Sequence, residues 1–200
     1  MKRRQFLCGW VVLLFELLSV AGISAVGLGI VAGGGYSTGN DFSSGLVSVK
    51  YLNPDFLNFG LDAHLYNYTP NDVTTRSYLG FAYIDDRLLT KNMLRVDWLA
   101  GISSAQTKYS TYKTDWSTTP GLGLEGNYEI SKKWSARAKA VGIIYSDGYS
   151  LLYQAGPEYK YKKWVAGIGI DGITSVSTGT GQTSTPSNNL GGMLAVGYVF

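Results

Sequence analysis

Asp62 and His64 come closest to a catalytic pattern in this chain. His64 is the only histidine, and it follows Asp62 by two positions, so in an extended strand both side chains lie on one face. An aspartate beside a histidine can orient the imidazole as a general base. No second acidic pair stands at a matching height, because Asp85-Asp86 falls in a predicted turn. We therefore interpret His64 as a satisfied member of a polar network, with hydrolysis as the remote alternative.

Other charged residues recur at alternate positions and oppose apolar ones, as Arg95 and Asp97 oppose Val96 and Trp98. Six of them are basic and six are acidic. Charges held away from water need partners, so this balance predicts an ion-paired network. Its predicted members, with the histidine, are Lys50, Asp62, His64, Arg76, Arg95, Asp97, Glu125, Glu129, Arg137, Lys139, Glu158, Lys160 and Asp171.

The elements that position these charges are all strands. Segments of about ten alternating residues separated by turn chemistry are typical of an all-β fold, a transmembrane antiparallel up-and-down β-barrel. Eight strands are the main rival to a count of ten, since a weak segment such as 43–52 could be miscounted. The predicted strands are 26–36, 43–52, 57–67, 75–84, 93–103, 120–130, 134–145, 150–161, 164–174 and 189–200.

An even number of strands places both chain ends on the periplasmic side of the membrane. The sequence predicts short periplasmic connections and generally longer extracellular ones, which is the usual asymmetry of such barrels. The expected periplasmic connections are 53–56, 85–92, 131–133 and 162–163, and the expected extracellular ones are 37–42, 68–74, 104–119, 146–149 and 175–188.

Each predicted strand has an apolar face, which we assign to lipid. In 75–84 this assignment turns Leu79, Phe81 and Tyr83 outward and Arg76 inward. Outward aromatic residues then gather near the periplasmic side as an interfacial belt. A soluble β-sandwich has the same alternation but explains neither this belt nor the terminal phenylalanine. The predicted belt is Tyr51, Phe59, Tyr83, Tyr128, Trp134, Tyr161, Trp164, Tyr198 and Phe200.

The first 25 residues have the pattern of a secretory signal peptide. Residues 1–4 include the basic Lys2, Arg3 and Arg4, and 6–21 form an apolar run interrupted only by Glu16. Small residues follow, so we expect cleavage after Ala25, with Ala21 as the alternative. A membrane anchor is the other interpretation, but the run is shorter than the ~20 residues that a spanning helix needs. The barrel domain is then 26–200.

Composition excludes several functional classes. Removing the signal takes away three basic side chains and one acidic one, which leaves 14 against 13, so no basic patch for nucleic acid is expected. The single cysteine, Cys8, lies inside the signal, and the mature chain has no thiol to mispair in an oxidising periplasm. One histidine and no cysteine provide no metal constellation, so we predict neither a metal nor a cofactor.

The chain ends in a strand whose alternate positions are apolar, with aromatic residues at Tyr198 and Phe200. This ending resembles the C-terminal signal of bacterial outer-membrane β-barrels. The resemblance implies an outer-membrane location and recognition of Tyr198 and Phe200 by the barrel assembly machinery. In size and glycine usage the chain resembles small opacity-type and YfaZ-like barrels.

Asp62-Ala63-His64 is similar to the Asp-x-His of omptins, which are ten-stranded outer-membrane proteases. Omptins build their site near the extracellular rim on long strands, whereas this pair lies near mid-strand in a mature chain of about 175 residues. A barrel-type lipid A deacylase would need His-x-Ser, and the corresponding residues here are His64-Leu65-Tyr66. Neither resemblance extends beyond these few residues.

We therefore expect a structural or surface-interaction barrel, monomeric, with a largely occluded lumen. Eight strands enclose room for side chains only, while sixteen or more leave an open channel, so ten strands lie near the closed end. Inward glycines such as Gly60 and Gly123 leave free space, and a narrow porin-like pore is the alternative. The expected partners are outer-membrane lipid and lipopolysaccharide. We interpret loop 104–119, which contains Lys108 and Lys113, as a solvated loop, with contact to lipopolysaccharide phosphates or to a host surface as the alternative.

Overall fold

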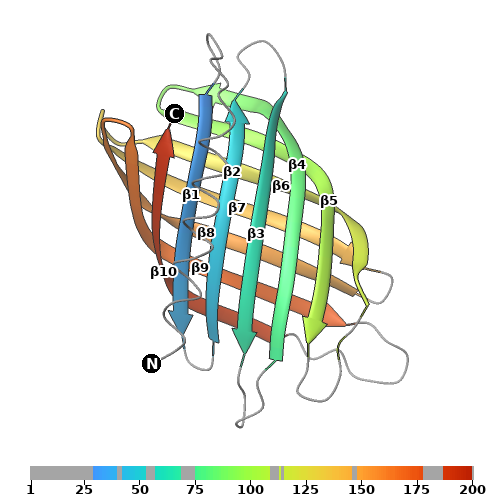
Figure 1. Cartoon of the computed structure of the whole chain (residues 1–200). Helices are drawn as coiled ribbons and strands as arrows, with labels where there is room; N and C mark the ends of the chain where they lie inside the picture. Colours follow the sequence, from blue (N-terminus) through green and yellow to red (C-terminus); the bar gives the residue numbers. More distant parts are fainter. Residues whose placement is uncertain are drawn as a thin grey trace, which may run out of the picture.

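The chain forms a closed antiparallel β-barrel in a computed structural model (Figure 1). The structure describes residues 29–39, 42–52, 57–68, 75–108, 113, 115–145, 148–177 and 187–199. The predicted signal peptide and Phe200 lie outside these described residues. Among the described residues, no helix is long and apolar enough to cross a membrane.

The described part of the chain contains ten strands, each paired with its sequence neighbours, and β1 pairs with β10. The prediction of an antiparallel up-and-down barrel is confirmed. The strands are β1 (Gly29–Gly39), β2 (Phe42–Leu52), β3 (Asn58–Tyr68), β4 (Thr75–Lys91), β5 (Leu94–Lys108), β6 (Ser117–Glu129), β7 (Trp134–Tyr145), β8 (Gly148–Tyr161), β9 (Trp164–Ser177) and β10 (Ser187–Val199).

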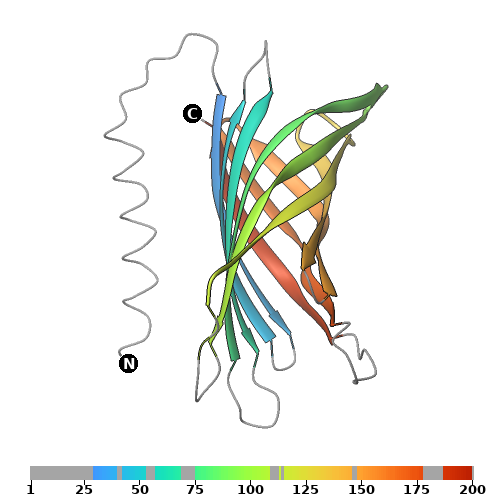
Figure 2. The same cartoon turned by 90° about the vertical axis from the view of Figure 1, so that its right-hand side faces the viewer.

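The strands are strongly inclined to the barrel axis, as Figure 2 shows. Register pairs followed once around the sheet lead from Glu129 back to Ser117 on β6, a stagger of twelve positions. With usual strand spacings this stagger corresponds to a tilt of about 40°, within the range of natural barrels. We call the end where β1 begins and β10 finishes the terminal end, and the opposite end the distal end.

The outer surface is apolar and the interior is polar. Leu194 is 67% exposed and Leu122 is 65% exposed, whereas Asp85 and Asp171 are 0% and 2% exposed. A soluble protein has the opposite arrangement, because isolated buried charges are costly and exposed apolar patches favour association. This barrel is therefore built for an apolar surrounding.

Aromatic side chains stand at both ends of the outward face of β8. Tyr149 and Tyr161 are twelve positions apart and are 50% and 55% exposed. At the tilt above they are about 30 Å apart along the axis, which matches the thickness of a bilayer core. At the terminal end, Trp164 and Tyr198 make an edge contact with ring centroids 4.9 Å apart. The outer surface thus has an apolar band with aromatic residues at its edges.

The assignment of faces in β4 was wrong. Leu79, Phe81 and Tyr83 point inward, where they are at most 5% exposed, and the remaining outward positions include the exposed Arg76. The reason is that this barrel fills part of its lumen with apolar side chains, so the larger residues of β4 belong inside. This inner apolar cluster consists of Tyr66, Leu79, Phe81, Tyr83, Leu99, Val141, Ile143 and Leu152.

Several predicted connections are partly strand, and 85–92 is almost entirely strand. β4 continues through the predicted turn 85–92 to Lys91, with a β-bulge between Arg87 and Leu89. A two-residue turn follows, in which Asn92 has a left-handed φ of 53°. Likewise, β5 extends to Lys108 and β6 begins at Ser117, which shortens the predicted loop 104–119.

Candidate functional site

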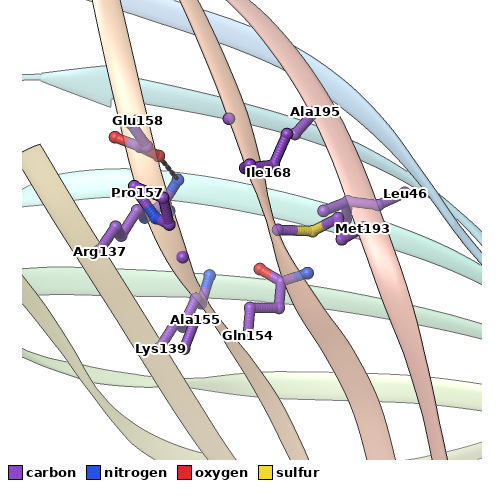
Figure 3. A pocket seen from close by; sticks show the side chains of 12 residues that line it. Leu46, Arg137, Lys139, Gln154, Ala155, Pro157, Glu158, Ile168, Met193 and Ala195 are labelled. Carbon is purple, nitrogen blue, oxygen red and sulfur yellow. Dashed lines mark ion pairs between the residues drawn. The ribbon is translucent and has the colours of Figure 1, made fainter. Parts of the chain in front are cut away.

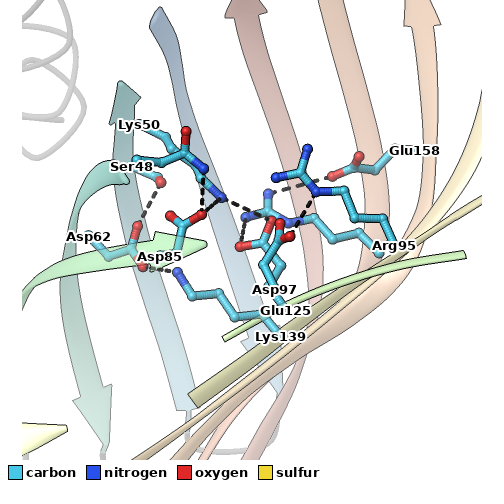
Figure 4. Close-up of polar contacts among 11 residues, drawn as sticks. Ser48, Lys50, Asp62, Asp85, Arg95, Asp97, Glu125, Lys139 and Glu158 are labelled. Carbon is cyan, nitrogen blue, oxygen red and sulfur yellow. Dashed lines mark hydrogen bonds and ion pairs between the residues drawn. The ribbon is translucent and has the colours of Figure 1, made fainter. Parts of the chain in front are cut away.

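A chain of ion pairs crosses the lumen toward the terminal end (Figure 4). Lys50 Nζ on β2 lies 3.1 Å from Asp85 Oδ1 on β4 and 3.8 Å from Glu125 Oε1 on β6. Arg137 on β7 continues the chain, at 3.1 Å from Glu125 Oε2 and 3.7 Å from Glu158 Oε1. Five strands are thereby connected through the interior, and charges from facing walls meet there.

The register explains how these residues come together. Asn127 is directly opposite Arg137 on the neighbouring strand, which places Glu125 diagonally from the guanidinium and within its reach. Glu158 is two positions from Gly156, the residue opposite Arg137 on the other side. Lys50 belongs to a distant strand and spans the barrel with its long side chain. Alternation in the sequence sets the inward direction, but closure of the barrel decides this last contact.

A second bridge joins β3 to β7. The Ser48 hydroxyl donates to Asp62 Oδ1 at 2.6 Å, and the Lys139 ammonium donates to Asp62 Oδ2. The same ammonium lies 4.2 Å from the ring centroid of Tyr83, a cation–π contact. Asp62 and Lys139 are both buried. This pair therefore ties two well-separated strands together near the middle of the lumen.

His64 is bound to Tyr66 rather than to Asp62. Its Nδ1 atom lies 2.9 Å from the Tyr66 hydroxyl, and the two rings stack with centroids 5.4 Å apart. As predicted, Asp62 and His64 share a buried face of β3. However, Asp62 Oδ1 accepts from Ser48 and Asp62 Oδ2 accepts from Lys139. These contacts connect strands and do not orient the imidazole of His64 as a base.

Asp171 lies deeper toward the distal end. It is 2% exposed and accepts from the Ser44 hydroxyl at 2.5 Å and from the Gln154 amide at 3.1 Å. Since Ser44 is on β2 and Asp171 is on β9, this contact too bridges separate strands. Here hydroxyl and amide donors satisfy the carboxylate.

The remaining predicted members lie near the terminal rim or outside the lumen. Arg95 Nε donates to Asp97 Oδ1 at 2.8 Å. Glu129 is exposed and Lys160 is half-buried, and neither forms an ion pair within the part of the chain that is described. Arg76 does not belong to the network, because it is exposed on the outer face of β4.

Two lumen residues were missed from the sequence. Asp85 was assigned to a turn, although it is fully buried and also accepts from the Asn58 amide at 2.9 Å. Tyr83 was assigned to the outer belt, although its ring covers Gly60, whose added Cβ would lie 2.1 Å from the ring. The sequence feature that could have placed Asp85 in a strand is Asn92, because asparagine favours a tight hairpin turn. A tight turn at residue 92 implies that β4 extends through residue 85.

These corrections change the charge balance of the interior. The described lumen holds six buried or half-buried carboxylates, Asp62, Asp85, Asp97, Glu125, Glu158 and Asp171, against five buried or half-buried cations, Lys50, Arg95, Arg137, Lys139 and Lys160. Within the described residues the interior therefore has a small excess of acidic side chains. Within the described residues, no group of three or more histidine, cysteine or acidic side chains is placed to hold a metal ion.

A small cavity of about 60 Å³ lies against the inner wall of β7–β10 (Figure 3). Arg137, Lys139, Gln154 and Glu158 supply its polar lining, and Met193 is part of its apolar lining. Beside the cavity, the β8–β9 ladder lacks the two pairs between Ala155↔Ile170 and Glu158↔Gly167, although the register is the same on both sides. Pro157 lies in this interval and cannot donate to the ladder. The cavity has room for a few water molecules.

No protein-family model matches the chain, and no curated protein matches its sequence. Among solved structures, it is similar to Neisserial surface protein A, with 15% identity, 87% of this chain and 96% of that chain covered, and a TM-score of 0.40. For a major outer membrane protein from Thermus thermophilus the values are 10%, 88%, 100% and 0.40. For the KdgM porin in complex with disordered oligogalacturonate they are 9%, 86%, 99% and 0.37. Values this low assign neither family nor function.

Proposed function

We propose that this chain is a bacterial outer-membrane β-barrel. The supporting observation is the distribution of polarity, with buried charges such as Asp62 and Lys139 inside and exposed leucines such as Leu122 and Leu194 outside. Closed barrels and helices are the structures that satisfy every backbone polar group in lipid. We further infer that the ten described strands are the complete barrel and that residues 1–25 are removed during export.

The test of this proposal is folding in the presence and absence of detergent. Protein lacking its first 25 residues is expected to form sheet and to shift its electrophoretic mobility on boiling only after transfer into detergent or lipid. Material that folds as a soluble monomer in plain buffer would contradict the proposal, since the apolar exterior would then need another explanation.

We propose that the barrel is a structural or surface-interaction protein with an occluded lumen. The bridges Lys50–Glu125, Asp62–Lys139 and Ser44–Asp171 all join side chains across the interior. The inner apolar cluster packs beside these bridges, and the cavity described above is too small for a hydrated solute. The pore alternative is supported by that same cavity and by its charged lining.

Planar-bilayer conductance separates the two functions. We expect no reproducible single-channel steps from the parent barrel, and raised conductance from the double variant Asp62→Ala/Lys139→Ala, which removes a bridge across the lumen. Reproducible steps from the parent, with a weak cation selectivity that follows from the small acidic excess of the lumen, would support the narrow pore instead.

Catalysis by Asp62 and His64 is the remote alternative. We propose that His64 has a structural role, because it is buried and its Nδ1 pairs with Tyr66. Any esterase or protease activity found in the purified barrel should therefore be unchanged in His64→Ala. Loss of such an activity in a folded His64→Ala barrel would favour an enzyme.

We also propose that the C-terminal strand is the assembly signal and that the folded barrel is monomeric. β10 closes the barrel against β1, and Tyr198 is in register with Trp164 on the other side. Deleting Phe200 or changing Tyr198→Ser should lower the amount of heat-modifiable barrel in outer membranes. Normal assembly of both variants, or a stable oligomer in detergent by light scattering, would contradict these points.

A further inference from the structure

Three cations converge on the outer face at the distal end. Arg76 on β4 is directly opposite Lys108 on β5, and Lys108 forms an isolated β-bridge with Lys113. Directly opposed residues of an antiparallel ladder share one face, with Cβ atoms about 4.5–5.5 Å apart. All three side chains are exposed. We call Arg76, Lys108 and Lys113 the distal basic triad.

Alternation places the triad outside the barrel. Leu79 and Phe81 of β4 point into the lumen, so Tyr78 and Arg76 point outward. Tyr78 is 36% exposed. Trp116, which directly precedes β6, the neighbour of β5, is 58% exposed. The triad thus lies on the surface that faces the surrounding membrane, next to aromatic side chains.

No ion pair within the described residues involves Arg76, Lys108 or Lys113. Asp115 is the nearby acidic residue along this segment, and it is likewise exposed without an ion pair there. Like charges directly opposite one another are destabilising in a sheet. Three juxtaposed cations therefore form a favourable site for an anion from outside.

The height of the triad indicates which anion it meets. Arg76 is two positions beyond Tyr78 toward the distal end, and Lys108 is in register with it. The outward aromatic residues mark the edge of the apolar band, so the triad lies just outside that band. In a bilayer this is the level of the headgroup phosphates.

We propose that the distal basic triad binds the phosphate groups of a phosphorylated glycolipid, the lipid A part of lipopolysaccharide, in the outer leaflet. This inference rests on the proposed outer-membrane location. Arg76 supplies a planar donor fork suited to phosphate oxygens, and the two lysines add positive charge. Tyr78 and Trp116 contact the neighbouring sugar and acyl region. The outer-leaflet lipid is thus held by residues of β4, β5 and the segment that follows β5.

The test uses the full mature barrel reconstituted in phosphatidylcholine vesicles with lipid A, with dephosphorylated lipid A, or without either. Retained glycolipid per barrel is measured by native mass spectrometry after detergent extraction. The variant is R76Q/K108Q/K113Q. The matched control is K91Q/K132Q/K133Q, which removes three exposed cations at the terminal end. Folding of each variant is checked by heat-modifiable mobility.

We expect the parent and the control to retain lipid A, and the triad variant to bind it about fivefold more weakly for each charge removed. Dephosphorylated lipid A should not be retained by any of them. Equal loss in both variants, full retention in the triad variant, or retention without phosphate would overturn the site. Saturable binding of inorganic phosphate by the parent without lipid would assign the site to free phosphate instead. If the triad variant still inserts into plain phosphatidylcholine vesicles, its loss of lipid A binding cannot be attributed to failure of the barrel proposal.

Discussion

Lys50 Nζ lies 3.1 Å from Oδ1 of Asp85, although the two residues come from strands separated by β3. Asp85 is fully buried, and the side chain of Lys50 is only 12% exposed. A buried carboxylate without a cation is strongly unfavourable. Lys50 also approaches Glu125, so it contacts two acidic residues that come from different strands.

Lys50→Met should therefore destabilise the barrel by about 3 kcal/mol, because two buried carboxylates lose their shared cation. Urea unfolding in detergent micelles, followed by tryptophan fluorescence, measures the effect. Lys160→Met is the matched control, since Lys160 is also predicted to face inward but makes no ion pair among the described residues. Equal losses in the two variants would show that the ion pairs of Lys50 contribute nothing specific.

The Asp62–Lys139 bridge should show strong coupling between its two members. Either Asp62→Asn or Lys139→Met leaves one buried charge unpaired, so each alone should cost about 3 kcal/mol. The double variant should cost clearly less than the sum of the two, because neither charge then remains. A double-mutant cycle of unfolding free energies measures this coupling, and strictly additive losses would argue against the bridge.

Gly60→Ala should be destabilising because the ring of Tyr83 occupies the space of the missing side chain. The added Cβ would lie 2.1 Å from Tyr83 Cζ, and overpacking of this kind costs about 1–3 kcal/mol. Gly45→Ala is the control, because nothing lies within 4 Å of its added Cβ. Tyr83→Ala should make Gly60→Ala tolerable, and if it does not, the ring contact is not the cause.

Lys162→Asn should stabilise the turn between β8 and β9. Lys162 has a φ of 55°, in the left-handed region that asparagine tolerates better than lysine. We expect a gain of up to about 1 kcal/mol in the free energy of unfolding, because the left-handed conformation costs an ordinary L-residue roughly 1–2 kcal/mol. Lys163→Asn, one residue later in the same turn, should give no gain because its φ is not positive. Equal effects of the two substitutions would indicate that charge rather than backbone conformation is responsible.

Local alternation along the chain was enough to predict the barrel class and the inward face of most strands. Alternation has a period of two, so the inward positions of β3, such as Asp62 and His64, follow from local pattern and are buried as expected. Short turns such as Lys162-Lys163 were also predicted correctly, because turn formation depends on local residues.

The inward face of β4 and the pairing of the charges depend on contacts between distant strands, so local patterns could not predict them. Leu79, Phe81 and Tyr83 are apolar enough to face lipid. In the closed barrel, however, these large side chains fill part of the interior volume. Arg76, which was predicted inside, therefore lies on the outer face. Asp85, which was predicted in a turn, lies in the lumen because β4 continues past it. Contacts such as Lys50–Glu125 depend on how the stagger of a closed sheet places distant strands opposite one another. The spacing of two residues in the sequence does not indicate how close their side chains are across the lumen.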